Sequence, residues 1–245
     1  MNKVLLISCI LIISLILGCS SEETVVVEEQ PIVLNDGLCS SNGYNTQEFF
    51  IKQDDGSIER FIELDTTSIN KLIKSESLEG IKDLTCLTYL LINQRSFSSY
   101  NDQFAGKLSS LSRLTNLRKL DARVAKITGD ISEISGLTNL TYLGLIGDDI
   151  TGEISDLSRM TKIEEITLSS TNVSGDIIAL RDLRSLRKVL LDDTSVMGDA
   201  SFFKEFSELK LLSLWNSNVN QASCRSVRVT TADSIKKVDA LCDSE

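Results

Sequence analysis

Apolar residues recur through the middle of the chain at a constant interval of 23 residues. Two phrases show this directly, since AKITGDIS at 125–132 returns as DDITGEIS at 148–155. The interval also separates five glycines: Gly106, Gly129, Gly152, Gly175 and Gly198. It separates five apolar residues in the same way: Leu120, Leu143, Ile166, Val189 and Leu212. Columns kept in register over four steps predict a chain built of repeated coils.

Each unit combines a strand with a returning segment, in the pattern L-x-x-L-x-x-L-x-L-x-x-x-x-I-x-G-x-I. Within YLGL, alternation places Leu143 and Leu145 on one face and Tyr142 and Gly144 on the other. We expect the leucines to face inward and the repeated glycine to occupy a tight bend. A single coil buries too little apolar surface to fold alone. Neighbouring coils must therefore supply burial and strand hydrogen bonds.

The pattern resembles the leucine-rich repeat family over roughly residues 60–220. The resemblance implies an α/β solenoid, a horseshoe or arc with a parallel concave β-sheet. ITGDIS and ITGEIS are similar to the L-S-G-x-I-P phrase of the plant-type subclass, which places a second short strand after the glycine. The family usually carries Asn at a turn position that five other residues occupy here: Ala125, Asp148, Thr171, Thr194 and Ser217. Asp, Thr and Ser can replace part of the backbone bonding that the Asn amide supplies, whereas Ala cannot.

The sequence patterns before and after the repeats differ from the repeat itself. EFFIKQDDGSIERFIEL holds two alternating apolar runs around Asp55-Gly56, which predicts a hairpin. We expect residues 49–80 to form an N-terminal cap and first coil, 81–221 the leucine-rich repeats, and 222–245 a C-terminal cap. The C-terminal pattern predicts a strand and then a helix from about Ala232 to Leu241. NQRSFSSYNDQFAG after Ile92 predicts an outward loop, either a contact region or simply solvated.

The first residues, MNKVLLISCILIISLILGCSSEE, combine a basic start with an apolar run of 14 residues. That run fits a signal-peptide core and is short for a membrane span of about 20 residues. ILGC is similar to the lipobox of bacterial lipoproteins, and the resemblance makes Cys19 the lipidated residue. Residues 1–18 are then a signal peptide and 19–48 a lipidated, flexible tether. The resemblance implies export and lipid anchoring to a bacterial membrane, at the outer membrane or cell surface. An ordinary secretory peptide or an uncleaved anchor is the alternative.

Four cysteines remain once the signal-peptide cysteine and Cys19 are set aside. An even number in an exported chain predicts disulfides. Cys224 and Cys242 bracket the last segment, so we expect them to pair, which leaves Cys39 with Cys86. Two free, buried thiols are the alternative for the second pair.

Composition argues against several functions. The net charge is −10 at pH 7, whereas nucleic-acid binding needs clustered Lys and Arg. The chain has no His, which excludes His-based triads and His-ligated zinc. No nucleophile, base and orienting group recur at plausible spacing, so we expect neither an enzyme nor a cofactor or metal site. The adjacent Asp192 and Asp193 would point to opposite faces of a strand, which disfavours a calcium or hydrolytic site there.

If the strands stack, their outward residues form columns on the concave sheet. Trp, Tyr and Arg most often dominate protein interfaces. The candidate ligand-binding residues are Tyr89, Lys119, Arg123, Tyr142, Ile146, Leu190 and Trp215. The alternatives are sheet propensity for the tyrosines and packing over the C-terminal cap for the tryptophan. The predicted function is that of a membrane-anchored surface lipoprotein binding a protein or glycan partner through the concave sheet. The alternative is a structural, envelope-organising lipoprotein without a discrete ligand.

Overall fold

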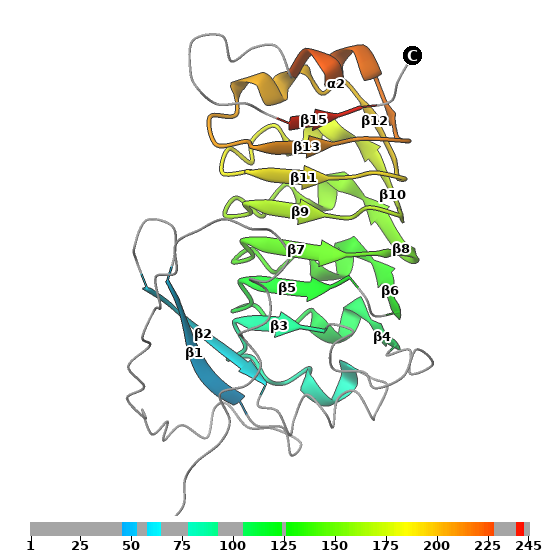
Figure 1. The fold of residues 1–245 in the computed structure, drawn as a ribbon. Helices are drawn as coiled ribbons and strands as arrows, with labels where there is room; N and C mark the ends of the chain where they lie inside the picture. The colour runs from blue at the N-terminus through cyan, green and yellow to red at the C-terminus, as the bar shows by residue number, and fades with distance from the viewer. Residues whose placement is uncertain are drawn as a thin grey trace, which may run out of the picture. The chain divides into compact units, whose positions relative to one another are not determined.

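The computed structural model describes residues 46–52, 58–64, 78–92, 105–123, 126–227 and 239–242. Over these ranges the repeats form a solenoid with two parallel sheets. The seven-stranded sheet runs in the order β15-β13-β11-β9-β7-β5-β3, and the six-stranded sheet in the order β14-β12-β10-β8-β6-β4 (Figure 1). Both sheets follow the coils in sequence, which confirms the predicted α/β solenoid.

The seven-stranded sheet takes one strand from each coil. Its strands are β3 Tyr89–Leu91, β5 Lys119–Ala122, β7 Tyr142–Leu145, β9 Glu165–Thr167, β11 Lys188–Leu190, β13 Leu211–Ser213 and β15 Asp239–Leu241. From β5 to β13 each residue pairs with the residue 23 positions later, as Lys119 does with Tyr142. The sequence period is therefore the register of the sheet. This is the sheet that the sequence predicts to be concave.

The second strand of each coil lies earlier than expected. The six-stranded sheet consists of β4 Ala105–Lys107, β6 Lys126–Asp130, β8 Gly147–Glu153, β10 Thr171–Asp176, β12 Ser195–Gly198 and β14 Asn218–Val219. From β6 to β12 these strands end at the repeated glycine or one residue beyond it, so the prediction of a strand after the glycine is wrong. At these four glycines φ lies between +99° and +129°, and the chain enters a 3-10 helix two or three residues after each of them.

A short 3-10 helix follows most strands of the six-stranded sheet. These helices are η3 Leu108–Leu111, η4 Ile131–Ile134, η5 Ile154–Leu157, η6 Ile177–Leu180 and η7 Ser201–Glu205, and a further 3-10 helix, η1 Leu78–Ile81, precedes β3. The acidic residue after the glycine caps several of them, as when Asp130 Oδ1 accepts from the Ser132 amide at 2.9 Å. Hydrogen bonds from Ser132 hold the pKa of Asp130 below its ordinary value, and those from Ser201 do so for Asp199.

The apolar columns fill the interior. Leu143 and Leu145 are fully buried, as the alternation predicts. The column before each strand of the seven-stranded sheet is buried as well: Leu117, Leu140, Ile163, Leu186 and Leu209. Each side chain lies beside its equivalent in the next coil, so the core is one continuous stack. Burial of this kind is the main stabilising contribution in a solenoid.

Polar side chains satisfy the backbone at the turns in two ways. Hydroxyls at the position that the family usually gives to Asn bond within their own coil, as Thr171 Oγ1 donates to the Leu168 carbonyl at 2.7 Å and Thr194 Oγ1 does the same to Leu191. Bonds between coils come from an asparagine that the sequence analysis missed. Asn139 Nδ2 donates to the Thr115 carbonyl of the preceding coil at 2.9 Å. LTNL, which occurs twice, was the available signal.

The N-terminal cap is the predicted hairpin. β1 Thr46–Lys52 and β2 Ile58–Leu64 pair antiparallel, with Lys52 opposite Ile58, and β1 begins three residues before the boundary expected at residue 49. The hairpin is hydrogen-bonded to the first described coil. The Thr88 amide donates to the Ile62 carbonyl at 3.0 Å, and the Ile62 amide donates to Thr88 Oγ1 at 2.7 Å.

The C-terminal cap holds a helix and a strand in the opposite order from the prediction. The helix is α2 Gln221–Val227, and residues 239–241, expected to be helical, form β15. β15 pairs in parallel with β13, because an open sheet edge offers backbone partners that a helix could not use. Asn220 Oδ1 accepts from the Ser223 amide at 3.2 Å and so caps α2, a signal that sequence reasoning passed over.

One of the two expected disulfides is confirmed. Cys224 of α2 is bonded to Cys242, which follows β15, with 6.1 Å between their Cα atoms. The bond closes the cap as predicted. Cys86 is half-buried, and its expected partner Cys39 lies outside the described residues, so that pair remains a prediction.

Several other expectations concern residues outside the described ranges. They are the signal peptide, the tether, Cys19, most of the loop after Ile92, and residues 232–238 of the expected helix. Among the described residues, no helix combines the length and apolarity needed to cross a bilayer.

The glycine column gives a direct test of the turn geometry. Gly152 has φ +116°, and a Cβ added there would lie 2.6 Å from Asp130 Oδ1 and 2.8 Å from Ile131 Cγ1. Gly152→Ala should therefore lower the free energy of unfolding by about 1–3 kcal/mol. Gly136→Ala is the matched control, because nothing lies within 4 Å of an added Cβ. Urea denaturation measures both, and equal stabilities would contradict the assignment.

Candidate binding surface

The outward face of the seven-stranded sheet carries its side chains in columns. The column at the strand starts is half-buried throughout and consists of Tyr89, Lys119, Tyr142, Glu165, Lys188 and Leu211. These residues are direct register partners from strand to strand. The next outward column contains three buried members, Gly144, Thr167 and Ser213. The face therefore has mostly large side chains in the column at the strand starts and several small, buried residues in the next column.

Four residues at one end of this face form what we call the Tyr–Arg cluster: Tyr89, Asp121, Arg123 and Tyr142. Arg123 makes a bidentate ion pair with Asp121, with Nε–Oδ1 2.8 Å and Nη2–Oδ2 2.7 Å. The Tyr142 hydroxyl donates to Asp121 Oδ2 at 3.4 Å, and the Arg123 guanidinium carbon lies 5.9 Å from the centroid of the Tyr142 ring. The carboxylate thus fixes both the guanidinium and the phenol.

The electrostatics of the cluster keep its phenols protonated. Burial, followed by the nearby Asp121 charge, raises the pKa of Tyr142 to about 12. Burial and Asp121 raise the pKa of Tyr89 as well, with a further contribution from Glu63 of the hairpin. The hydrogen bond with Asp121 raises the pKa of Arg123. At physiological pH the cluster therefore presents phenol and guanidinium donors held in place by one carboxylate.

Gly144 makes room for this arrangement. A Cβ at this position would lie 2.9 Å from both Cε1 and the hydroxyl of Tyr142, and 3.2 Å from Cγ of Arg123. The tyrosine ring and the arginine therefore lie over the bare backbone of β7. Sequence reasoning placed Gly144 on the outward face without giving it a role. A glycine inside a strand often marks such a close approach, and that was the available signal.

A second group, the Trp cluster, lies towards the C-terminal end of the sheet and consists of Ser169, Asp192, Ser213 and Trp215. Asp192 Oδ1 accepts from the Trp215 amide at 3.0 Å and from the Ser213 hydroxyl, and Oδ2 accepts from the Ser169 hydroxyl at 3.3 Å. The residue Trp215 is 53% exposed, which contradicts the alternative that it is packed away over the C-terminal cap. Asp192 thus fixes the backbone that carries an exposed indole.

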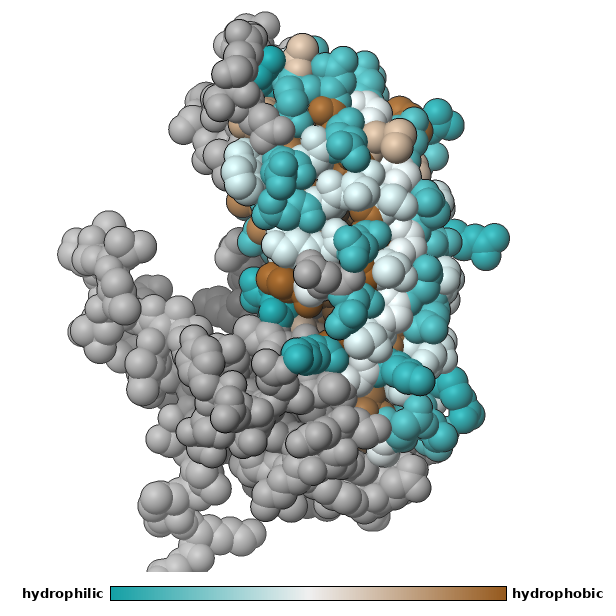
Figure 2. All heavy atoms as spheres, turned by 90° about the vertical axis from the view of Figure 1, so that its right-hand side faces the viewer, coloured by the Kyte–Doolittle hydropathy of each residue, from teal (hydrophilic) through white to brown (hydrophobic). Residues whose placement is uncertain are grey.

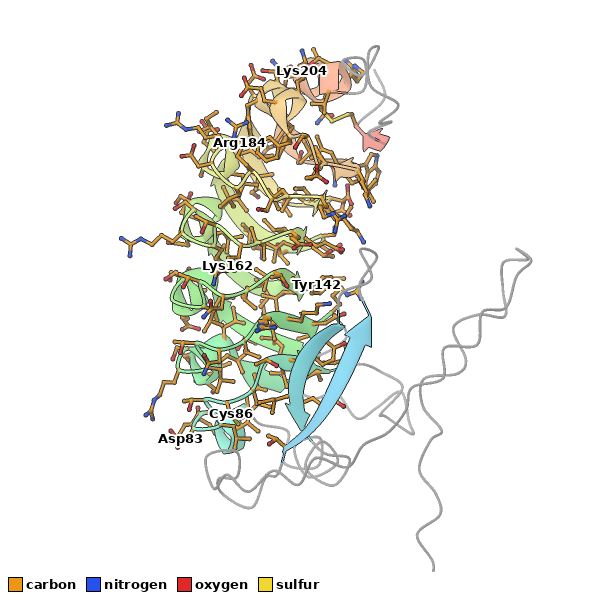
Figure 3. All side chains as sticks on the ribbon, turned by 90° about the vertical axis from the view of Figure 1, so that its left-hand side faces the viewer. Asp83, Cys86, Tyr142, Lys162, Arg184 and Lys204 are labelled. Atoms are coloured by element: carbon orange, nitrogen blue, oxygen red, sulfur yellow. A yellow bond between two sulfur atoms is a disulfide. The ribbon has the colours of Figure 1, made fainter. Side chains whose placement is uncertain are left out.

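The structure brings some of the sequence candidates together and separates others. Tyr89, Lys119, Arg123 and Tyr142 belong to adjacent strands or the residues directly after them, and Figure 3 labels Tyr142 within this region. Trp215 follows a strand three positions further along the sheet, or about 14 Å at the usual strand spacing. Ile146, directly after β7, and Leu190 of β11 are half-buried. Tyr89, Arg123 and Tyr142 therefore belong to one cluster and Trp215 to the other, whereas Lys119, Ile146 and Leu190 belong to neither.

The fold is a leucine-rich repeat solenoid. Among solved structures, the plant peptide hormone receptor RGFR1 in complex with RGF2 is 28% identical over 58% of this chain and 22% of that chain, with a TM-score of 0.49. PEPR1 in its AtPEP1 complex is 25% identical over 58% of this chain and 20% of that chain, with a TM-score of 0.49. Internalin C2 of Listeria monocytogenes str. 4b F2365 is 20% identical over 64% of this chain and 71% of that chain, with a TM-score of 0.43.

This chain thus spans about a fifth of the length of the two plant receptors. No family model and no curated protein matches it. Within the described part of the chain, no group of three or more Cys, Asp and Glu side chains is placed to hold a metal ion.

Thr167 stands between the two clusters and is 3% exposed. Within the described ranges, its Oγ1 is the buried side-chain polar atom that has no hydrogen-bond partner. A buried hydroxyl without a partner destabilises a fold by about 1–3 kcal/mol. The Thr167 side chain therefore fills space between the two clusters, and its unpaired hydroxyl lowers the free energy of unfolding.

A pair of valine substitutions tests this assignment. Thr167→Val keeps the side-chain shape and removes the hydroxyl, so the free energy of unfolding should stay unchanged or rise by about 1 kcal/mol. Thr171→Val is the matched control on the same coil, because the buried Thr171 hydroxyl donates to the Leu168 carbonyl. That variant should lose about 1 kcal/mol in urea denaturation. An equal loss at both positions would show that Thr167 Oγ1 has a partner.

Proposed function

We propose that this protein is a membrane-anchored surface lipoprotein whose solenoid binds a protein partner through the outward face of the seven-stranded sheet. The observation that carries the proposal is the Tyr–Arg cluster. Its guanidinium and phenol are already fixed by Asp121 before any partner arrives. Binding then orders few side chains, so little of the contact energy is lost to entropy.

The composition of the face supports a protein partner. Tyr, Trp and Arg are the residues whose truncation most often weakens protein complexes, and here they occupy two clusters on one sheet. Basic residues at 119, 123 and 188 are balanced by acidic residues at 121, 165 and 192. From β3 to β13 the outward positions of this sheet carry no net charge, within a chain of net charge −10, so recognition there depends on shape and hydrogen bonds more than on long-range attraction.

The anchor belongs to the proposal on the strength of the sequence. ILGC ending at Cys19 and the apolar run before it support lipidation, and the Cys224–Cys242 bond supports an oxidising compartment. Several acyl chains hold a protein firmly, since each buried methylene contributes about 0.8 kcal/mol. A glycan remains the second type of ligand, because an exposed tryptophan such as Trp215 can also stack on a sugar ring.

Variants of the face test the binding function. Arg123→Ala combined with Trp215→Ala should reduce binding to protein and glycan arrays at least about tenfold, because each removes an interface anchor. The full-length chain in detergent is the probe. Lys204→Ala combined with Ile178→Ala is the matched control, since both residues are exposed outside this sheet. Equal array signals for the two variants would contradict the proposal, and silence of the wild type on every array would favour the structural alternative.

Substitution at the lipobox tests the anchor separately. Cys19→Ser removes the thiol that would carry diacylglycerol, so the protein should leave the membrane fraction and lose labelled palmitate. Cys86→Ser provides a control that removes a different cysteine. Palmitate incorporation that survives Cys19→Ser would show that Cys19 is not the lipidated residue.

A further inference from the structure

The charges of the repeats are sorted to opposite sides of the solenoid. One side, which we call the strand-start flank, comprises the segments that lead from the 3-10 helices into the seven-stranded sheet: residues 112–119, 135–142, 158–165 and 181–188. These segments contain nine basic and three acidic residues, a net charge of +6. A strongly basic side is unexpected in a chain whose net charge is −10.

The other side of the same four coils is acidic. The strand-end flank comprises the segments that leave the seven-stranded sheet, pass through the six-stranded sheet and complete the 3-10 helices: residues 121–134, 144–157, 167–180 and 190–203. These segments contain eleven acidic and two basic residues, a net charge of −9. By segment, in chain order, the strand-start flank carries +3, 0, 0 and +3, and the strand-end flank carries −1, −4, −1 and −3. Every strand-end segment is therefore acidic, and no strand-start segment is.

Both flanks present charged groups to solvent. On the strand-start flank Arg159, Lys162 and Arg184 are exposed, and Figure 3, which views this side, labels Lys162 and Arg184. On the strand-end flank Glu133 and Asp149 are exposed. Figure 2 views that side and shows hydrophilic residues spread along it.

Ion pairs within a flank do not remove the imbalance. Arg187 lies 3.5 Å from Glu164, and Arg181 lies 3.7 Å from Asp182, so both acids are already included in the net charge of +6. The Arg184–Glu205 pair, at 3.2 Å, brings in one acid from the next coil and leaves the flank basic.

Screening by salt limits the distance over which the charge of each flank acts. At physiological ionic strength the Debye length is about 8 Å. The exposed groups named above precede the strands on one flank and follow them on the other, and a strand such as β5, four residues long, spans about 13 Å. A partner that touches one flank therefore responds to the charge of that flank more than to the net charge of the chain.

We propose that the strand-start flank of one copy docks side by side on the strand-end flank of a second copy. A second copy is the partner for which the structure shows both complementary surfaces. In each of the four coils the strand-end segment is negative and the strand-start segment is neutral or positive, so two stacks lying in parallel attract wherever the strand-start segment is basic. The contact is heterologous and can continue from copy to copy as a lateral array.

Two charge-reversal variants of the full-length chain test the contact. The strand-start variant carries Arg159→Glu and Lys162→Glu, and the strand-end variant carries Glu133→Lys and Asp149→Lys. Two differently tagged copies are co-precipitated in detergent at low salt, and thermal melting checks that each variant folds. Wild-type copies should co-precipitate, and raising the salt from 50 to 500 mM should reduce recovery at least about tenfold.

Each variant paired with itself should be recovered less than wild type, because its reversals lower the charge of one flank from +6 to +2 or from −9 to −5. The strand-start variant mixed with the strand-end variant should associate as wild type does, because each retains one native flank and these two native flanks are complementary. Wild-type copies that stay monomeric at low salt would overturn the proposal, as would failure of the mixed pair. Binding of wild type to phosphatidylglycerol vesicles, lost in the strand-start variant while copies remain monomeric, would assign the flank to an anionic membrane instead.

Discussion

The constraint on which this structure depends is the fixed length of the coil. Because each turn uses 23 residues between β5 and β13, every residue of these strands in the seven-stranded sheet pairs with its equivalent in the next turn. Without this constant coil length, neither the continuous apolar core nor the pairing between strands would form. The constraint also governs the surface, since any residue type favoured at one coil position becomes a stripe. The clusters and the two charged flanks are consequences of the same repetition.

This constraint explains why so much of the fold could be predicted. A period is visible in sequence, and it fixes which residues are buried, which strands pair and in what register. The hairpin and the Cys224–Cys242 bond could also be predicted, because alternation and cysteine position are local signals. The predictions that proved wrong concern the C-terminal cap, where the repeat ends, and the second strand of each coil, whose position depends on backbone conformation at the repeated glycine. Beyond Val219 the repeat offers no template, and residues 239–241, predicted to be helical, pair with the sheet edge as β15.

The sequence predicted which residues face outward on the candidate surface, but not the contacts that hold them in place. Column positions identified Tyr142, Arg123 and Trp215 as outward-facing, but they could not reveal that Asp121 and Asp192 organise the two clusters. Those contacts depend on rotamers and on the bare backbone at Gly144, which a pattern of residue types does not encode. The acidic members are the ones a search for interface anchors passes over, since carboxylates are depleted at interface centres. Their value here lies in holding neighbouring side chains in place.

One departure from the period shows how such a protein can change. Tyr89 of β3 and Lys119 of β5 are 30 residues apart, seven more than one coil requires, yet they remain direct register partners. The surplus lies between Ile92 and Gly106, on the connection from one sheet to the other, where the core does not constrain chain length. Evolution can therefore lengthen that connection, or duplicate and delete whole coils, without disturbing the stack. A gain or loss of a few residues inside a strand would instead break the phase of every turn beyond it.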